Sequence, residues 1–110
     1  MFGKSGEDRR SEIRRPADRR AVVLASGLEL PCRITDESRG GLKLKLDRRG
    51  ELPRQILVIE VTAALVVEVD VRWTKGHEAG GRRGEETDLR GLVPQRLAAA
   101  REAWVRAGGR

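Results

Sequence analysis

The sequence predicts an all-β fold, either a small antiparallel barrel or a sandwich, and three observations lead to this prediction. Several short segments alternate apolar and polar residues with a period of two, the pattern of a strand with one buried face. Most connections between these segments have the length of a hairpin loop. No helical pattern alternates with the strands, as a parallel sheet would require. The 110 residues fit one small domain.

The individual strands follow from the same alternation. Ser26-Gly27 is a plausible hairpin tip between the first two segments. The clearest segment, LVVEVDVRW at 65–73, is expected to turn its alternate valines and Trp73 inward and its charged residues outward. A glycine- and charge-rich loop is expected to follow at 74–86. The expected strands are 21–24, 28–34, 42–46, 55–61, 65–73 and, as a short last strand, 87–93.

The two ends of the chain differ from this pattern. Residues 1–20 carry seven Lys or Arg against four Asp or Glu and few large apolar residues, which predicts a flexible, arginine-rich arm. At the other end, Pro94 suits a first helical position, and apolar residues from Leu97 to Trp104 recur at helical spacing. The sequence therefore predicts an arm at 1–20, a barrel at 21–93 and a helix at 94–107.

The composition excludes several classes of protein. Cys32 is the single cysteine, so neither an internal disulfide nor a site with several cysteine ligands is possible. Its place among alternating apolar residues predicts a small core residue. No apolar run approaches the roughly 20 residues of a membrane span, and the N-terminus lacks the apolar stretch of a signal peptide. We therefore expect a soluble, cytoplasmic protein with a net charge of +6.

Two short motifs carry the chemistry. RSEIR, from Arg10 to Arg14, has the form RxxxR, and DESRGG contains Asp36, Ser38 and Gly41 in the spacing DxSxxG. Each motif alone has an ordinary structural interpretation. Arginines in a charged segment are commonly solvated, and Asp and Ser at a turn commonly bond their own backbone. A turn between two strands needs only one or two such residues, so the composition of DESRGG also indicates a binding loop.

The two motifs, in this order around the first two predicted strands, resemble the PilZ domain over about residues 9–93. The resemblance implies a six-stranded β-barrel that binds the bacterial second messenger cyclic di-GMP. It implies a receptor rather than an enzyme, with cyclic di-GMP as ligand, no cofactor and no metal. It also implies an effector protein as partner, to which an arm that orders on ligand binding would signal.

The chemistry of the ligand suggests a role for each motif residue. Guanidinium groups bridge the O6 and N7 atoms of guanine, stack on purines and pair with phosphates. Asp36 would accept from the N–H edge of a guanine, Ser38 would bond base or phosphate, and Gly41 would let the backbone approach the ligand. The expected ligand-binding residues are Arg9, Arg10, Arg14, Arg15, Asp36, Ser38 and Gly41, with Arg10 and Arg14 as the principal cations.

Two other functions fit parts of the same sequence. A small basic barrel that binds single-stranded nucleic acid suits the charge, but three aromatic residues supply few stacking surfaces. A PilZ domain without nucleotide binding could act as a protein-interaction module through its terminal helix. His77 is expected in a surface loop, where no second metal ligand lies at a suitable spacing. Trp73 and Trp104 are expected to be core or helix-docking residues rather than base-stacking surfaces.

Overall fold

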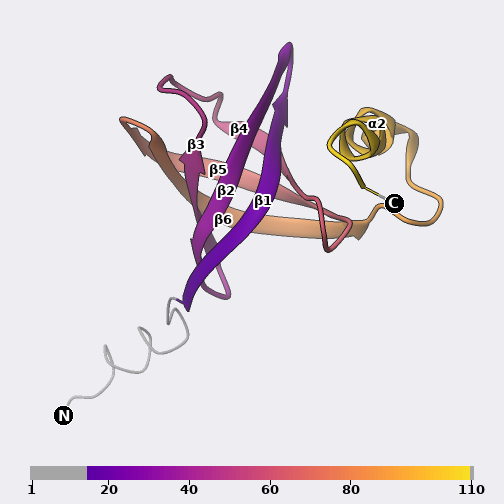
Figure 1. Ribbon diagram of the computed structural model, residues 1–110, viewed down its shortest axis with the longest axis horizontal. Helices are drawn as coiled ribbons and strands as arrows, with labels where there is room; N and C mark the ends of the chain where they lie inside the picture. Colours follow the sequence, from indigo (N-terminus) through magenta and orange to yellow (C-terminus); the bar gives the residue numbers. More distant parts are fainter. Residues whose placement is uncertain (1–14, 110) are drawn as a thin grey trace.

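The computed structural model describes residues 15–109. Six strands are followed by a short helical segment at the C-terminus, shown in chain order in Figure 1. The elements are β1 (Arg15–Ala25), β2 (Leu28–Glu37), β3 (Gly41–Leu46), β4 (Gln55–Glu60), β5 (Leu65–Lys75), β6 (Glu78–Asp88), the 3-10 turn η1 (Gln95–Leu97) and the helix α2 (Ala98–Arg106).

The six strands close into a barrel in the order β1-β2-β3-β6-β5-β4, and every neighbouring pair is antiparallel. The predicted small antiparallel barrel with a C-terminal helix is therefore confirmed. In Figure 1, α2 lies to one side of the barrel, beside the C-terminus. Residues 15–109 contain no helix long and apolar enough to cross a membrane.

The alternation in the sequence sorts side chains between the inside and the outside of the barrel. Leu42, Leu44 and Leu46 on β3 are buried, while Lys43 and Lys45 point to the outer face. The interior is filled by aliphatic residues from all six strands. Cys32 belongs to this interior, as predicted, and burial raises the pKa of its thiol to about 12. The thiol therefore stays protonated at physiological pH and acts as a small core residue.

A second apolar cluster lies on the outer side of the barrel, under the helix. Leu97, Ala100, Ala103 and Trp104 pack with residues of β1, β4 and β5. The indole Nε1–H of Trp104 donates a hydrogen bond of 2.8 Å to the backbone oxygen of Val61. The predicted helix is thus present, as η1 and α2, and Trp104 anchors it to the barrel.

The first strand begins earlier than the sequence indicated. Residues 15–20, which we assigned to the arm, form the first half of β1 and pair with the end of β2 from Arg15↔Glu37 onward. Pro16 is tolerated because β1 pairs with β4 only from Ala21 to Leu24, so its first half is an edge. Charged side chains in this half of β1 form hydrogen bonds with oppositely charged side chains of β2. These bonds take the place of the apolar contacts that this half of the strand lacks.

The closing strand of the barrel is also a correction. The segment 74–86, expected to be a loop, contains most of β6, whereas 87–93 is a strand only as far as Asp88. β6 pairs with β3 on one side and β5 on the other. The glycines of β6 hide the strand pattern because they lack side chains. Atoms of other residues occupy the space where a Cβ on these glycines would lie. A Cβ on Gly81, for example, would lie 2.6 Å from the backbone oxygen of Asp70.

Trp73 does not face the core as predicted. Its side chain is 42% exposed on the outer surface of β5. The cause is a register shift between Val71 and Trp73, which inserts one extra residue relative to β6. A bulge of one residue reverses the face of every following side chain in a strand. The simple alternation read from the sequence therefore fails beyond Val71.

Candidate ligand-binding site

The DxSxxG motif forms the connection between β2 and β3. The N–H of Ser38 donates to the oxygen of Gly41 at 2.9 Å, and the N–H of Gly41 donates back to Ser38 at 3.4 Å. The oxygen of Gly40 accepts a hydrogen bond of 3.0 Å from the N–H of Arg83 on β6. The connection is therefore closed on itself and tied to the neighbouring strand, which makes it a rigid element of the barrel end.

Asp36 carries an unusual atom. It stands in β2 opposite Pro16 of β1 and Lys43 of β3. Its Oδ1 is buried and accepts no hydrogen bond within the part of the chain that the structure describes. A buried acceptor left without a donor costs about 1–3 kcal/mol, so such an atom in a folded protein calls for an explanation.

Ser38 and Gly41 follow Asp36 in the same motif. Ser38 is a buried polar residue, only 8% exposed. A Cβ on Gly41 would lie 3.2 Å from the oxygen of Gly81 and 3.5 Å from the hydroxyl of Ser38. The glycine therefore allows the connection to lie close against β6. Ser38 and Gly41 are therefore in contact, and Asp36 precedes them near the end of β2. The assignment of these three residues to ligand binding stays a prediction.

Glu37, between Asp36 and Ser38, forms ion pairs with arginines of neighbouring strands. Its carboxylate accepts two hydrogen bonds from Arg19 on β1, at 2.6 and 3.2 Å, and lies 3.6 Å from Arg83 on β6. Arg19 also donates to the buried Glu60 on β4 at 3.1 Å. The hydrogen bonds from Arg19 hold the pKa of Glu37 below its usual value. This cluster joins four strands at one end of the barrel and holds the β2–β3 connection in place.

Cations surround the connection on its exposed side. Arg15 lies opposite Glu37 in the β1–β2 ladder, Arg39 is exposed within the connection, and Arg82 lies opposite Gly41 on β6. Arg82 is exposed and makes no ion pair with any residue in 15–109. Of the predicted arginines, Arg15 is therefore near the motif, while Arg9, Arg10 and Arg14 lie outside the described residues.

Sequence reasoning missed Arg82, because residues 74–86 were interpreted as a loop. A residue in a predicted loop has no predicted partner on a neighbouring strand, so the position of Arg82 opposite Gly41 could not be inferred. The two adjacent arginines at 82 and 83 were the only signal. In the structure they divide their roles: Arg83 pairs with Glu37 and Glu86, and Arg82 faces solvent.

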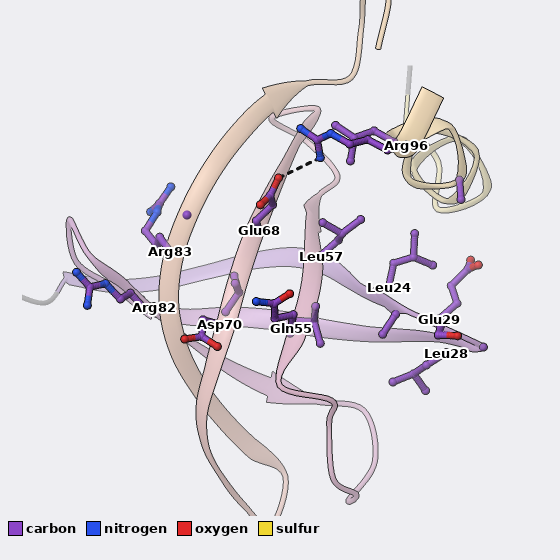
Figure 2. Close-up of a pocket in the computed structure, with 18 residues that line it drawn as sticks. Leu24, Leu28, Glu29, Gln55, Leu57, Glu68, Asp70, Arg82, Arg83 and Arg96 are labelled. Atoms are coloured by element: carbon purple, nitrogen blue, oxygen red, sulfur yellow. Dashed lines mark hydrogen bonds and ion pairs between the residues drawn. The ribbon is translucent and has the colours of Figure 1, made fainter. Parts of the chain in front are cut away.

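A groove of about 980 Å³ is lined largely by other residues of the barrel (Figure 2). The β1–β2 hairpin, the helical segment and β4 to β6 line it, and its far end reaches Arg82. Its other charged groups are mostly neutralised by ion pairs, such as Glu68 with Arg96 at 3.1 Å and Asp70 with Arg54 at 3.1 Å. None of Asp36, Ser38 and Gly41 lines it. The connection with the unsatisfied carboxylate is therefore the better candidate site.

His77 is exposed in the turn between β5 and β6, where its Nδ1 lies 3.3 Å from the oxygen of Leu46. The residues from 15 to 109 hold no cluster of three side chains suited to bind a metal ion.

The fold and this site define a small antiparallel β-barrel with a rigid, polar connection at one end as its candidate binding element. The chain belongs to the PilZ domain family: the model of that family matches residues 8–93. The family is one of cyclic di-GMP receptor domains, as the resemblance of the two motifs implied. No curated protein and no solved structure matches the chain.

Proposed function

We propose that the chain is a cyclic di-GMP receptor that binds its ligand at the β2–β3 connection and has no catalytic role. The observation that carries the proposal is the buried Oδ1 of Asp36, which lacks a donor among residues 15–109. The N1–H and N2–H groups of a guanine are donors of the kind this atom lacks. The membership of the PilZ family supports the same ligand.

The surrounding cations suit the rest of the ligand. Cyclic di-GMP carries two phosphates, and guanidinium groups form strong, forked hydrogen bonds with phosphate oxygens. Arg39 and Arg82 flank the connection on its exposed side. Arg15, at the start of β1, would add a third cation, and Arg9, Arg10 and Arg14 precede it directly in the sequence. Because the ligand is an intracellular messenger, the proposal also assigns the chain to the bacterial cytoplasm.

Calorimetric titration of the purified chain with cyclic di-GMP tests this proposal. We expect binding by the natural chain and a loss of about 10- to 150-fold in affinity for Asp36→Ala, because a hydrogen bond to a charged group contributes about 1.5–3 kcal/mol. The melting temperature of the free Asp36→Ala variant should stay the same or rise, since the substitution removes a buried acceptor that has no donor.

Asp47→Ala is the matched control, because Asp47 is an exposed acid directly after β3. Its affinity should equal that of the natural chain. GTP and single-stranded DNA serve as control ligands. Absence of heat with cyclic di-GMP would refute the receptor function, and binding of DNA that weakens steeply with salt would favour the nucleic-acid alternative.

We further propose that ligand binding orders the arm before β1 and so creates a surface for an effector protein. The arginines at 9, 10 and 14 would be drawn to the dianionic ligand at the barrel end, where β1 begins.

Hydrogen exchange should therefore slow in residues 9–14 when cyclic di-GMP binds. Arg14→Ala should reduce this protection and should lower the affinity for cyclic di-GMP about tenfold or more. Residues 21–24, paired on both sides in the barrel, are the internal reference. Equal exchange of residues 9–14 with and without ligand would contradict the ordering.

A further inference from the structure

Trp73 is a large aromatic side chain on a polar surface, and the core does not account for its position. It is 42% exposed, although tryptophan is usually well buried. Its indole lies over Gly80 of β6: an ideal Cβ on Gly80 would overlap the Nε1, Cε2 and Cζ2 atoms of the ring. The ring therefore extends from β5 across the neighbouring strand.

The ring points toward the candidate site. Gly80 lies opposite Lys43 of β3, and Lys43 lies opposite Asp36 of β2. These positions form one row across the barrel surface, from the unsatisfied carboxylate to the indole. Neighbouring strands are about 4.8 Å apart, so β2 and β6 are separated by roughly 10 Å along this row. Arg82, two residues beyond Gly80 on β6, shares the outer face with Lys43.

We propose that Trp73 stacks on one guanine of the ligand while Asp36 reads the other, with Lys43 and Arg82 near the phosphates between them. This inference rests on the proposed function and adds a recognition element to it. Aromatic side chains bind bases by stacking, and nearby cations strengthen such sites. The separation of about 10 Å exceeds one purine ring system, so the row suits a ligand with two bases better than a mononucleotide.

A purely structural role for Trp73 predicts different behaviour. An aromatic ring laid over a strand glycine stabilises a sheet by covering the exposed backbone. Phe and Leu at position 73 both offer an apolar side chain that can cover Gly80, but only Phe has an aromatic face for a base. The pair Trp73→Phe and Trp73→Leu therefore separates stacking from covering.

The test combines tryptophan fluorescence with calorimetry on the full chain. Trp73 and Trp104 are the two tryptophans, and Trp104 is only 3% exposed, so a ligand that stacks should quench the solvent-exposed component of the emission. We expect Trp73→Leu to weaken cyclic di-GMP binding by about 5- to 150-fold. Trp73→Phe should retain most of the affinity, and the two variants should melt at similar temperatures. GMP should bind far more weakly than cyclic di-GMP to the natural chain.

The outcomes separate this inference from the proposed function. Binding that Asp36→Ala weakens, but that shows no quenching and has equal affinity in Trp73→Leu, would overturn the stacking role and leave the receptor function intact. An equal loss of affinity in the Phe and Leu variants, together with lowered melting temperatures, would assign Trp73 to covering Gly80 and also overturn stacking. No binding of cyclic di-GMP by the natural chain would overturn both.

Discussion

Trp104→Ala is expected to lower the free energy of unfolding by about 3–5 kcal/mol, the usual cost of removing a buried tryptophan from a core. Trp104 is 3% exposed and belongs to the outer apolar cluster that attaches α2 to the barrel. The substitution would also leave the oxygen of Val61 without the 2.8 Å hydrogen bond that it accepts from the indole. Both losses act at the same contact between helix and barrel.

Urea unfolding followed by circular dichroism measures this change. Val105→Ala is the matched control on the same helix, because Val105 is largely exposed and its truncation should cost less than about 0.5 kcal/mol. Trp104→Phe should fall between the two, since it keeps part of the apolar contact but not the hydrogen-bond donor. If Trp104→Ala changed the unfolding free energy by less than 1 kcal/mol, the outer cluster would contribute little to stability.

Arg19→Met should lower the free energy of unfolding by about 2–3 kcal/mol at pH 7. Removal of one partner from a buried ion pair costs about 3–5 kcal/mol, and we reduce this value because the Arg19 side chain is 36% exposed. The variant leaves two carboxylates, Glu37 and the 5%-exposed Glu60, without the guanidinium between them. Arg54→Met is the control: the Arg54 pair with Asp70 is solvent-exposed and should contribute less than about 1 kcal/mol.

The pH dependence gives this prediction a second readout. The hydrogen bonds of Arg19 lower the pKa of folded Glu37 below its usual 4.5. A carboxylate with a lowered folded pKa stabilises the protein above its unfolded pKa, and this contribution is lost as the pH falls through the folded pKa. The difference between the natural chain and Arg19→Met should therefore shrink as the pH falls from 7 to below 4.5. A difference that is constant over this range would mean that packing of the arginine stem, rather than its charge, is responsible.

Local alternation was sufficient to predict the strands whose apolar residues are regular. The LKLKL segment and the valines of β5 are placed as expected because each inward position is filled by its own side chain. β6 could not be predicted, because Ala79 is its only buried residue with a side chain. The contacts of its glycines come from β5, through Trp73 and Val69, and depend on a pairing that no local window contains.

The candidate site was predicted to the extent that it lies in one contiguous motif. Asp36, Ser38 and Gly41 fall within a stretch of six consecutive residues, so the sequence alone identifies them as one motif. Arg82 and Trp73 enter the site region only through the closure of the barrel and through a bulge in β5. Alternation could not locate this bulge, because only Thr74 and Lys75 follow Trp73 in β5 and no apolar residue there shows the change of phase.

Closure of the barrel restricts how an effector protein could recognise this domain. A sheet with free edges can accept an additional strand from a partner, whereas paired strands offer no backbone groups for such an exchange. Among the described residues, the first half of β1 is a stretch that pairs on one side only. Pro16 lacks an N–H there, and charged residues follow it. A partner that approaches this half of β1 would therefore bind its side chains, and its affinity should respond to substitutions of those side chains rather than to the backbone of an edge strand.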